Sequence, residues 1–170
     1  MFTLIPLTRD RNTAINAFDT LRFRALRDLV WAKFSRGQTR LASFSEAQRS
    51  SVNRKFVGVQ EIPVGKIIGT FGRENDFDNK FRPLGNHLRD RWVDTFLSLI
   101  TEVWPPILAH KIGEQYYVEN GHHRTSVARA VGMAYIQAEV WEYPIRPVKA
   151  AHCQPVSSYS TRPSNKTCPA

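Results

Sequence analysis

The chain has 170 residues, of which 42% are hydrophobic, and a formal net charge of +9. This length fits one domain with a buried core plus an additional segment. Because the sequence contains no apolar run of 18 residues and no secretory leader, we expect a cytoplasmic protein without a membrane partner. Its two cysteines, Cys153 and Cys168, lie near the C-terminus without metal-ligand spacing, so neither a disulfide framework nor a metal site is predicted.

The positive charge is concentrated at the N-terminal end. Residues 1–60 carry 11 Lys+Arg and 4 Asp+Glu, whereas residues 61–146 carry 10 and 11, and residues 147–170 carry 3 and none. A basic segment can neutralise nucleic-acid phosphates. It can equally form a solvated helix face or a patch for an acidic partner. Nucleic-acid binding is therefore one of three alternative interpretations of residues 1–60.

The first elements in chain order form a basic helical extension over residues 1–55. Phe18-Asp19-Thr20 resembles a helix start and predicts a helix over about 20–35. The expected apolar stripe of this helix consists of Leu21, Leu26, Leu29, Val30 and Phe34. Ser43-Phe44-Ser45-Glu46 is a capping-box pattern and predicts a short helix to about Val52.

Strand signals begin after this extension. Residues 56–64 predict a strand that ends near Pro63, and residues 66–70 continue the apolar character. Residues 72–78 then form a polar loop without the ligand spacing of a calcium site. A long amphipathic helix is predicted from about His87 to Val103. Its apolar face would contain Leu88, Trp92, Phe96, Ile100 and Val103.

The second half of the domain should contain a hairpin, a helix and a closing strand. Pro105-Pro106 ends the long helix, and the strands over 107–111 and 116–119 flank a turn at Gly113. Residues 135–143 alternate apolar and polar side chains as in a strand. From residue 144 on, Pro, Ser and Thr predominate and predict a disordered tail, so the domain is placed at 56–146 and the tail at 147–170.

The most informative stretch runs from Tyr116 to Gly132 and predicts a strand, a tight turn and a helix. Asn120-Gly121 is a turn dipeptide, and Gly132 lies where a helix C-terminal glycine belongs. The first helical turn therefore contains His122, His123, Arg124, Thr125 and Ser126. Because a helix N-terminus has unpaired N–H groups and a positive dipole end, this turn is suited to bind an anion such as phosphate.

The segment from about Val59 to Tyr143 resembles the ParB/sulfiredoxin superfamily. The most specific pieces are Pro105-Pro106-Ile107 and Glu119-Asn120-Gly121-His122-His123-Arg124. The resemblance implies an α+β fold, namely a ParB/sulfiredoxin-like small mixed β-sheet flanked by helices. Gly-His-His-Arg is similar to the turn of free serine kinases that share this fold. Sulfiredoxins have a catalytic cysteine where this chain has His122, so sulfiredoxin chemistry is not expected.

The same resemblance implies nucleotide binding. The ligand would be a nucleoside triphosphate, CTP or ATP, with Mg²⁺, held by Asn120, Gly121, His122, His123 and Arg124 and by the backbone of Thr125 and Ser126. By analogy with the family, Arg73 would contribute a further phosphate contact, and Glu74 is the nearest candidate for the catalytic base of the serine kinases. Partition proteins of the family have additional domains downstream, and no full partition clamp is expected within this chain.

Three functions follow as alternatives. The first is a nucleotide-binding regulatory or switch protein, which could also contact DNA or form a homodimer. The second is a small-molecule kinase or nucleotide hydrolase, in which His122 or His123 would donate hydrogen bonds or transfer a proton. In that case Glu74, Asp76 or Asp78 would activate a hydroxyl or hold Mg²⁺ through water. The third is a DNA-binding accessory protein that uses residues 1–60. A nuclease is disfavoured because no two-metal carboxylate cluster is recognisable.

Overall fold

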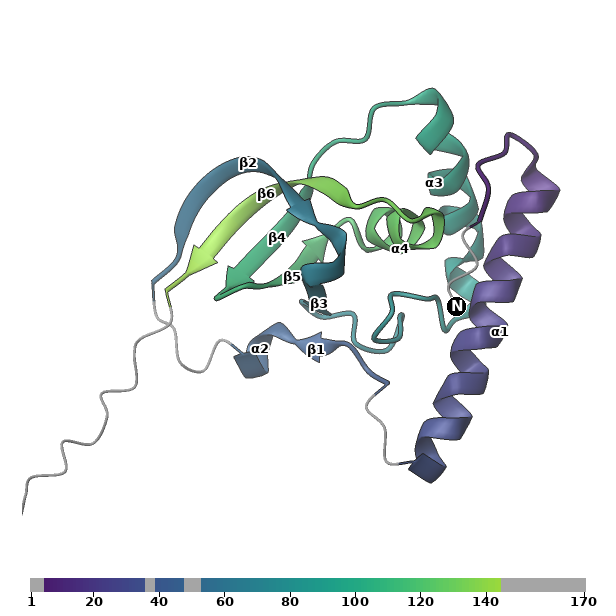
Figure 1. The fold of residues 1–170 in the computed structure, drawn as a ribbon, viewed down its shortest axis with the longest axis horizontal. Coiled ribbons are helices and arrows are strands. Elements are labelled where there is room, and N and C mark those ends of the chain that lie inside the picture. The colour runs from purple at the N-terminus through teal and green to yellow at the C-terminus, as the bar shows by residue number, and fades with distance from the viewer. Residues whose placement is uncertain (1–4, 36–38, 48–52, 145–170) are drawn as a thin grey trace, which may run out of the picture.

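The computed structural model describes residues 5–35, 39–47 and 53–144, which fold into one six-stranded mixed sheet with helices beside it (Figure 1). The helices are α1 (Arg11–Ser35), α2 (Phe44–Ala47), α3 (Arg89–Thr101) and α4 (His122–Val131), with 3-10 turns η2 (Val64–Lys66) and η3 (Asn86–Leu88). The strands are β1 (Ala42–Ser43), β2 (Lys55–Pro63), β3 (Ile67–Thr70), β4 (Ile107–Ile112), β5 (Gln115–Asn120) and β6 (Tyr135–Tyr143). The predicted α+β class with an N-terminal helix is confirmed. None of the helices in these ranges has the length and apolar character needed to cross a membrane.

The strand order of the sheet is β1-β3-β5-β4-β6-β2. Strands β4 and β5 form the predicted antiparallel hairpin, and β2 pairs antiparallel with β6. Strands β3 and β5 run parallel, with Thr70 beside Val118. Their carboxyl ends therefore lie at the same edge of the sheet, where the loop after β3 and the turn after β5 meet. In sheets with parallel strands, ligands commonly bind at such an edge.

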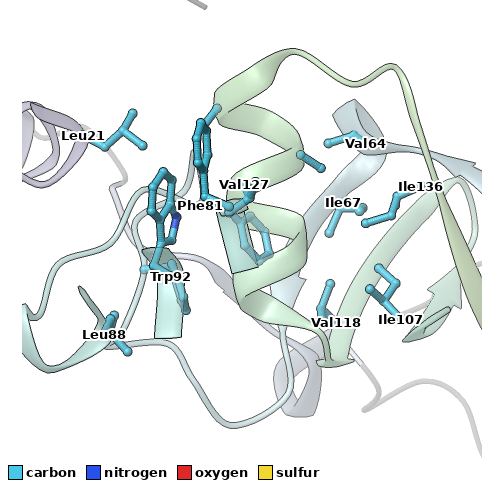
Figure 2. Close-up of a cluster of buried hydrophobic side chains, with 14 of the residues drawn as sticks. Leu21, Val64, Ile67, Phe81, Leu88, Trp92, Ile107, Val118, Val127 and Ile136 are labelled. Carbon is cyan, nitrogen blue, oxygen red and sulfur yellow. The ribbon is translucent and has the colours of Figure 1, made fainter. Parts of the chain in front are cut away.

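Helix α4 lies between the sheet and the outer helices (Figure 2). Val127 on α4 and Ile67, Ile107 and Val118 on the strands are fully buried, and Trp92 of α3 is buried in the same cluster. The indole Nε1 of Trp92 donates a hydrogen bond of 2.9 Å to Oγ of Ser126. This bond fixes α3 against α4, so the polar face of α3 lies next to the first turn of α4.

Helix α1 differs from its predicted form in two respects. It begins at Arg11 instead of near residue 20, because Asp10 accepts hydrogen bonds from the backbone N–H and the hydroxyl of Thr13 at 2.8 and 2.6 Å. The buried side also differs from the predicted stripe and consists of Ala14, Ala17, Phe18, Leu21 and Ala25. Val30 and Phe34, which were expected to be buried, are 56% and 82% exposed.

The long helix also ends earlier than predicted. Helix α3 ends at Thr101, and Val103 lies outside it and is 93% exposed, because the chain is already extended at Glu102 before the two prolines. The short helix α2 covers Phe44–Ala47, and the rest of its predicted range lies outside the described residues. The predicted disordered tail and both cysteines also lie outside the described residues.

A cluster of ion pairs connects α1 to the loop after β3. Asp28 of α1 lies 2.9 Å from the guanidinium of Arg82 and 3.5 Å from Nζ of Lys80. Arg82 also pairs at 2.5 Å with Asp78, whose side chain is only 2% exposed. Because a buried carboxylate requires a counter-charge, Arg82 fixes the loop as well as α1.

Candidate functional site

A cleft of about 420 Å³ lies at the carboxyl ends of β3 and β5, between α3 and the first turn of α4. It brings together Arg73, Asn120, Gly121, His122, His123 and Arg124 from the predicted site. It also contains residues that were not predicted, among them His87, Arg91, Glu102 and Glu119. The predicted turn is thus one wall of a larger site.

The N-terminus of α4 opens directly into this cleft. Gly121 precedes the helix with a φ of +101°, in the left-handed region that side chains disfavour. No side chain caps this end of α4, and the first intrahelical bond, at 2.9 Å, runs from the N–H of Thr125 to the carbonyl of Gly121. The N–H groups of His122, His123 and Arg124 therefore have no partner within the helix. Together with the helix dipole, they favour an anion in the cleft.

Arg124 carries a positive charge without a carboxylate partner among the described residues. Its guanidinium donates to the backbone carbonyls of Pro105 and Pro106, the latter at 3.1 Å. Burial and the nearby charge of Arg91 lower the pKa of Arg124, although it stays protonated at neutral pH. The two arginines repel each other across the cleft, and an anion between them would relieve this repulsion.

Arg91 is the principal residue of the cleft that the sequence did not identify. It lies on the same face of α3 as Thr95 and Ser98, and all three line the cleft. Within the described part of the chain, the guanidinium of Arg91 makes no hydrogen bond and no ion pair, although its backbone carbonyl accepts a bond of 2.7 Å from the hydroxyl of Thr95. Its polar position on an amphipathic helix was visible in the sequence. The packing of α3 against α4, which directs Arg91 into the site, was not.

Arg73 reaches the cleft from the loop after β3. Its guanidinium pairs at 2.8 Å with Asp76, which also lies 3.6 Å from Nε2 of His87. Asp76 therefore offsets part of the positive charge on this wall. Among the described residues that line the cleft, Arg91 and Arg124 are the arginines without a carboxylate partner.

His122 is buried beneath the cleft and serves to join two elements. Its side chain contacts Thr70, with 2.6 Å between Nε2 and Oγ1, and its ring stacks on Phe77 with a centroid distance of 6.2 Å. Burial lowers the pKa of His122 to about 4, with a further contribution from the charge of Arg73. The ring is therefore neutral at pH 7.

His123 is more accessible and packs edge-on against Phe77 at 5.6 Å. Its Nδ1 atom is buried and has no hydrogen-bond partner among the described residues. Burial, followed by the charge of Arg91, lowers the pKa of His123 to about 4. In the unliganded cleft, neither histidine is thus poised to exchange a proton near neutral pH.

Thr125 and Ser126 lie in the predicted turn, but their side chains point into the protein. The hydroxyl of Thr125 donates at 3.1 Å to the carbonyl of Gly121, and the hydroxyl of Ser126 accepts from Trp92. Both side chains are buried, and neither lines the cleft. Their hydrogen bonds stabilise the first turn of α4 on the side that faces the protein interior.

Two of the acidic candidates in the loop after β3, Glu74 and Asp78, do not line the cleft, whereas Asp76 pairs with the cleft residue Arg73. Glu74 accepts a hydrogen bond of 3.0 Å from Ser43, and Asp78 is buried against Arg82. Glu119 at the end of β5 does line the cleft, and its Oε2 atom lies 2.6 Å from Nε2 of the buried His110. The sequence contained Glu119 next to the turn, but its partner His110 is brought near only by the pairing of β4 and β5.

No protein-family model and no curated protein match this sequence. Among solved structures, the chain is similar to sulfiredoxin from Arabidopsis thaliana, with 19% sequence identity and a TM-score of 0.37. The match covers 51% of this chain and 86% of the sulfiredoxin chain. A likeness at this level does not indicate a ligand or an activity for this protein.

Proposed function

We propose that this protein binds the phosphate groups of a nucleoside triphosphate in the cleft at the N-terminus of α4, as a regulatory ligand. The observation that carries the proposal is the pair formed by Arg91 and Arg124. Both line the cleft, and neither forms an ion pair with a carboxylate of the described residues. Two unpaired arginines beside an uncapped helix end form a typical site for a polyanion.

The volume of the cleft and its hydrogen-bond donors favour phosphate groups over a smaller anion. Its volume of about 420 Å³ exceeds the needs of a single carboxylate or sulfate. Donors are present on two walls, because Arg91 comes from α3 and the free N–H groups come from α4. A chain of phosphates could contact both walls at once. The resemblance of the Gly121–Arg124 turn to the phosphate-binding turns of ParB-type proteins supports the same ligand class.

Magnesium would enter this site with the phosphate oxygens. The described residues contain no group of three or more His, Cys, Asp or Glu side chains that could hold a metal ion. Mg²⁺ commonly binds with few protein ligands and keeps several waters when phosphates coordinate it. Its contribution would be to neutralise phosphate charge, while Arg91 and Arg124 orient the phosphate groups.

A thermal-shift screen of CTP, ATP, ADP and GTP, with and without Mg²⁺, tests the proposal. We expect at least one triphosphate to raise the melting temperature of the full chain. Arg91→Ala and Arg124→Ala should each remove that rise. Arg89→Ala is the matched control, because Arg89 is on the same helix as Arg91 but does not line the cleft. If no nucleotide shifts the wild-type protein, the proposal is contradicted.

Nucleotide hydrolysis or phosphotransfer is a second candidate, and Glu119 is the observation that favours it. Glu119 is a carboxylate at the cleft whose position is fixed by His110, whereas Glu74 lies outside the cleft. Glu119 could accept a proton from water or from a hydroxyl substrate attacking the terminal phosphate. Release of phosphate should then be lost in Glu119→Gln and retained in Glu74→Gln. Binding without any turnover by the wild-type protein would leave only the regulatory function.

A further inference from the structure

Helix α1 has a second apolar face that nothing in the described structure covers. Phe23, Val30, Trp31 and Phe34 are 69%, 56%, 68% and 82% exposed. They recur at the spacing that places side chains on one side of a helix, opposite the buried side that contains Leu21 and Ala25. Figure 1 shows that the C-terminal end of α1 extends away from the other elements. Such a concentration of exposed aromatic side chains on one helix is typical of an interaction surface.

Two exposed basic side chains accompany this apolar face. Arg27 and Lys33 are exposed in the same part of α1, whereas Arg24 is half-buried and lines the groove between α1 and the domain. The acidic residue of this part, Asp28, is engaged by Arg82 and Lys80 of the domain as well as by Arg27. Between residues 23 and 35, α1 therefore presents aromatic and basic groups outward, while its carboxylate pairs with the loop after β3.

We infer that this face of α1, defined by Phe23, Val30, Trp31 and Phe34, binds to an anionic lipid surface, in contrast to the expectation from the sequence that the protein has no membrane partner. A helix with aromatic residues on one face and Lys or Arg at its margins lies in the plane of a membrane interface. The aromatic side chains enter the boundary between headgroups and acyl chains. The basic side chains remain at the level of the anionic headgroups, which attract them electrostatically.

Charge complementarity favours this occupant over a second copy of the chain. Two α1 helices packed through these faces would bring Arg27 and Lys33 of both copies together, and like charges at an interface oppose association. A nucleic acid would satisfy the basic residues. It would leave Val30 and the aromatic side chains without the apolar environment that a membrane interface provides.

The surface contains a suitable control region of opposite charge. Val103 and Tyr135 are 93% and 56% exposed, and they line a separate groove. That groove includes Glu61 and Glu102 and no lysine or arginine. Serine substitutions at Val103 and Tyr135 remove exposed apolar surface from a groove that also contains acidic residues. The double variant V103S/Y135S is therefore the matched control for changes on α1.

The test is flotation of the full chain with lipid vesicles. We expect the wild-type protein to float with vesicles of phosphatidylcholine containing about one-third phosphatidylserine, and to bind vesicles of phosphatidylcholine alone roughly tenfold or more weakly. The double variants F23S/F34S and R27Q/K33Q should each lose binding to the anionic vesicles, whereas V103S/Y135S should keep it. Because all these side chains are on the surface, circular dichroism should show the same fold for every variant.

Quenching by brominated lipid identifies the side chain that enters the interface. Brominated anionic vesicles should quench the tryptophan fluorescence of the wild-type protein. Trp31→Phe should keep the binding and lose most of the quenching, because the other tryptophans lie in the domain. The inference is overturned if the wild-type protein does not float with anionic vesicles, or if F23S/F34S floats as well as the wild type. It is also overturned if single-stranded DNA binds with the same loss in these variants while vesicles do not bind.

Discussion

The Oγ1 atom of Thr70 lies 2.6 Å from Nε2 of His122, and this contact joins the end of β3 to the first turn of α4. Thr70 is fully buried, and the loop that follows it brings Arg73 to the cleft. His122 is therefore a residue that helps to hold two walls of the site together. Its role in the unliganded protein is positional, since its ring faces the core beneath the cleft.

The low pKa of His122 predicts that the protein loses stability in mild acid. Burial holds the pKa of His122 near 4 in the folded protein, whereas an unfolded histidine has a pKa of about 6.5. The unfolded chain therefore takes up the proton first, and the stability that is complete above pH 6.5 declines as the pH falls toward 4. For His122 the loss should be roughly 2–3 kcal/mol.

Urea unfolding at pH 7 and pH 5 measures this effect. His122→Gln should lower the stability at both pH values and show a smaller difference between them than the wild type. Lys66→Met, which alters an exposed pair with Glu114, should keep the wild-type difference. An unchanged pH dependence in His122→Gln would show that this histidine does not account for the acid sensitivity.

Gly121 should tolerate no side chain. Its φ of +101° is strained for any other residue, and a Cβ atom there would lie 2.8 Å from Cβ of the buried Ile107. Gly121→Ala should therefore destabilise the protein by about 2–4 kcal/mol, from backbone strain and overpacking together. Gly65→Ala is the control, because that position has open space around it and an ordinary φ. Thermal unfolding of both variants should show a large decrease only for Gly121→Ala.

Ser126 should contribute to stability and not to ligand binding. Its hydroxyl accepts the hydrogen bond of the buried Trp92 indole, and its side chain does not line the cleft. Ser126→Ala should cost about 1–3 kcal/mol, because the indole N–H loses its partner. Nucleotide affinity, measured well below the melting temperature, should stay within about twofold of the wild type. A large loss of affinity with unchanged stability would place Ser126 in the binding site instead.

The ion pair between Arg82 and Asp78 should be one of the stronger polar contributions to the fold. Arg82→Met would leave the buried Asp78 carboxylate without its counter-charge, which should cost about 3–5 kcal/mol. The exposed pair of Lys66 and Glu114 should contribute far less, because solvent screens it, so Lys66→Met is the comparison. Chemical denaturation of the two variants measures both values. Similar losses of stability in Arg82→Met and Lys66→Met would contradict the claim that burial makes the pair of Arg82 and Asp78 the stronger one.

The sheet and the motif helix could be predicted from the sequence because their signals are local. Alternation of apolar residues indicated β6, and Asn120-Gly121 and Gly132 marked the two ends of α4. Helix α1 was predicted less well because both of its sides carry apolar residues. Periodicity alone favoured Leu21, Val30 and Phe34, of which only Leu21 is buried. Packing against α3 buries Phe18 in addition, which the periodicity did not indicate. The residue that caps α1 is Asp10, which accepts a hydrogen bond from the backbone of Thr13. Asp19, which the sequence suggested as the cap, lies inside the helix.

The site was predictable only where its residues are consecutive. Gly121 to Arg124 lie together in the chain and in the cleft. Arg91 is contributed by a helix whose orientation depends on tertiary packing, and Glu119 gains His110 only through strand pairing. Glu74 was assigned by its position in the chain, and the structure directs its carboxylate to Ser43. Spacing along the sequence carries no information about such contacts.

Isothermal titration of the full chain with the best nucleotide from the thermal-shift screen, in the presence of Mg²⁺, tests the central claim most directly. Wild type and Arg89→Ala should bind one nucleotide per chain with equal affinity. Arg91→Ala and Arg124→Ala should each weaken binding by about tenfold or more, because each removes a charge-assisted contact to phosphate. Equal affinity in all four proteins, or no binding by the wild type at millimolar nucleotide, would contradict the assignment of this cleft as a phosphate-binding site.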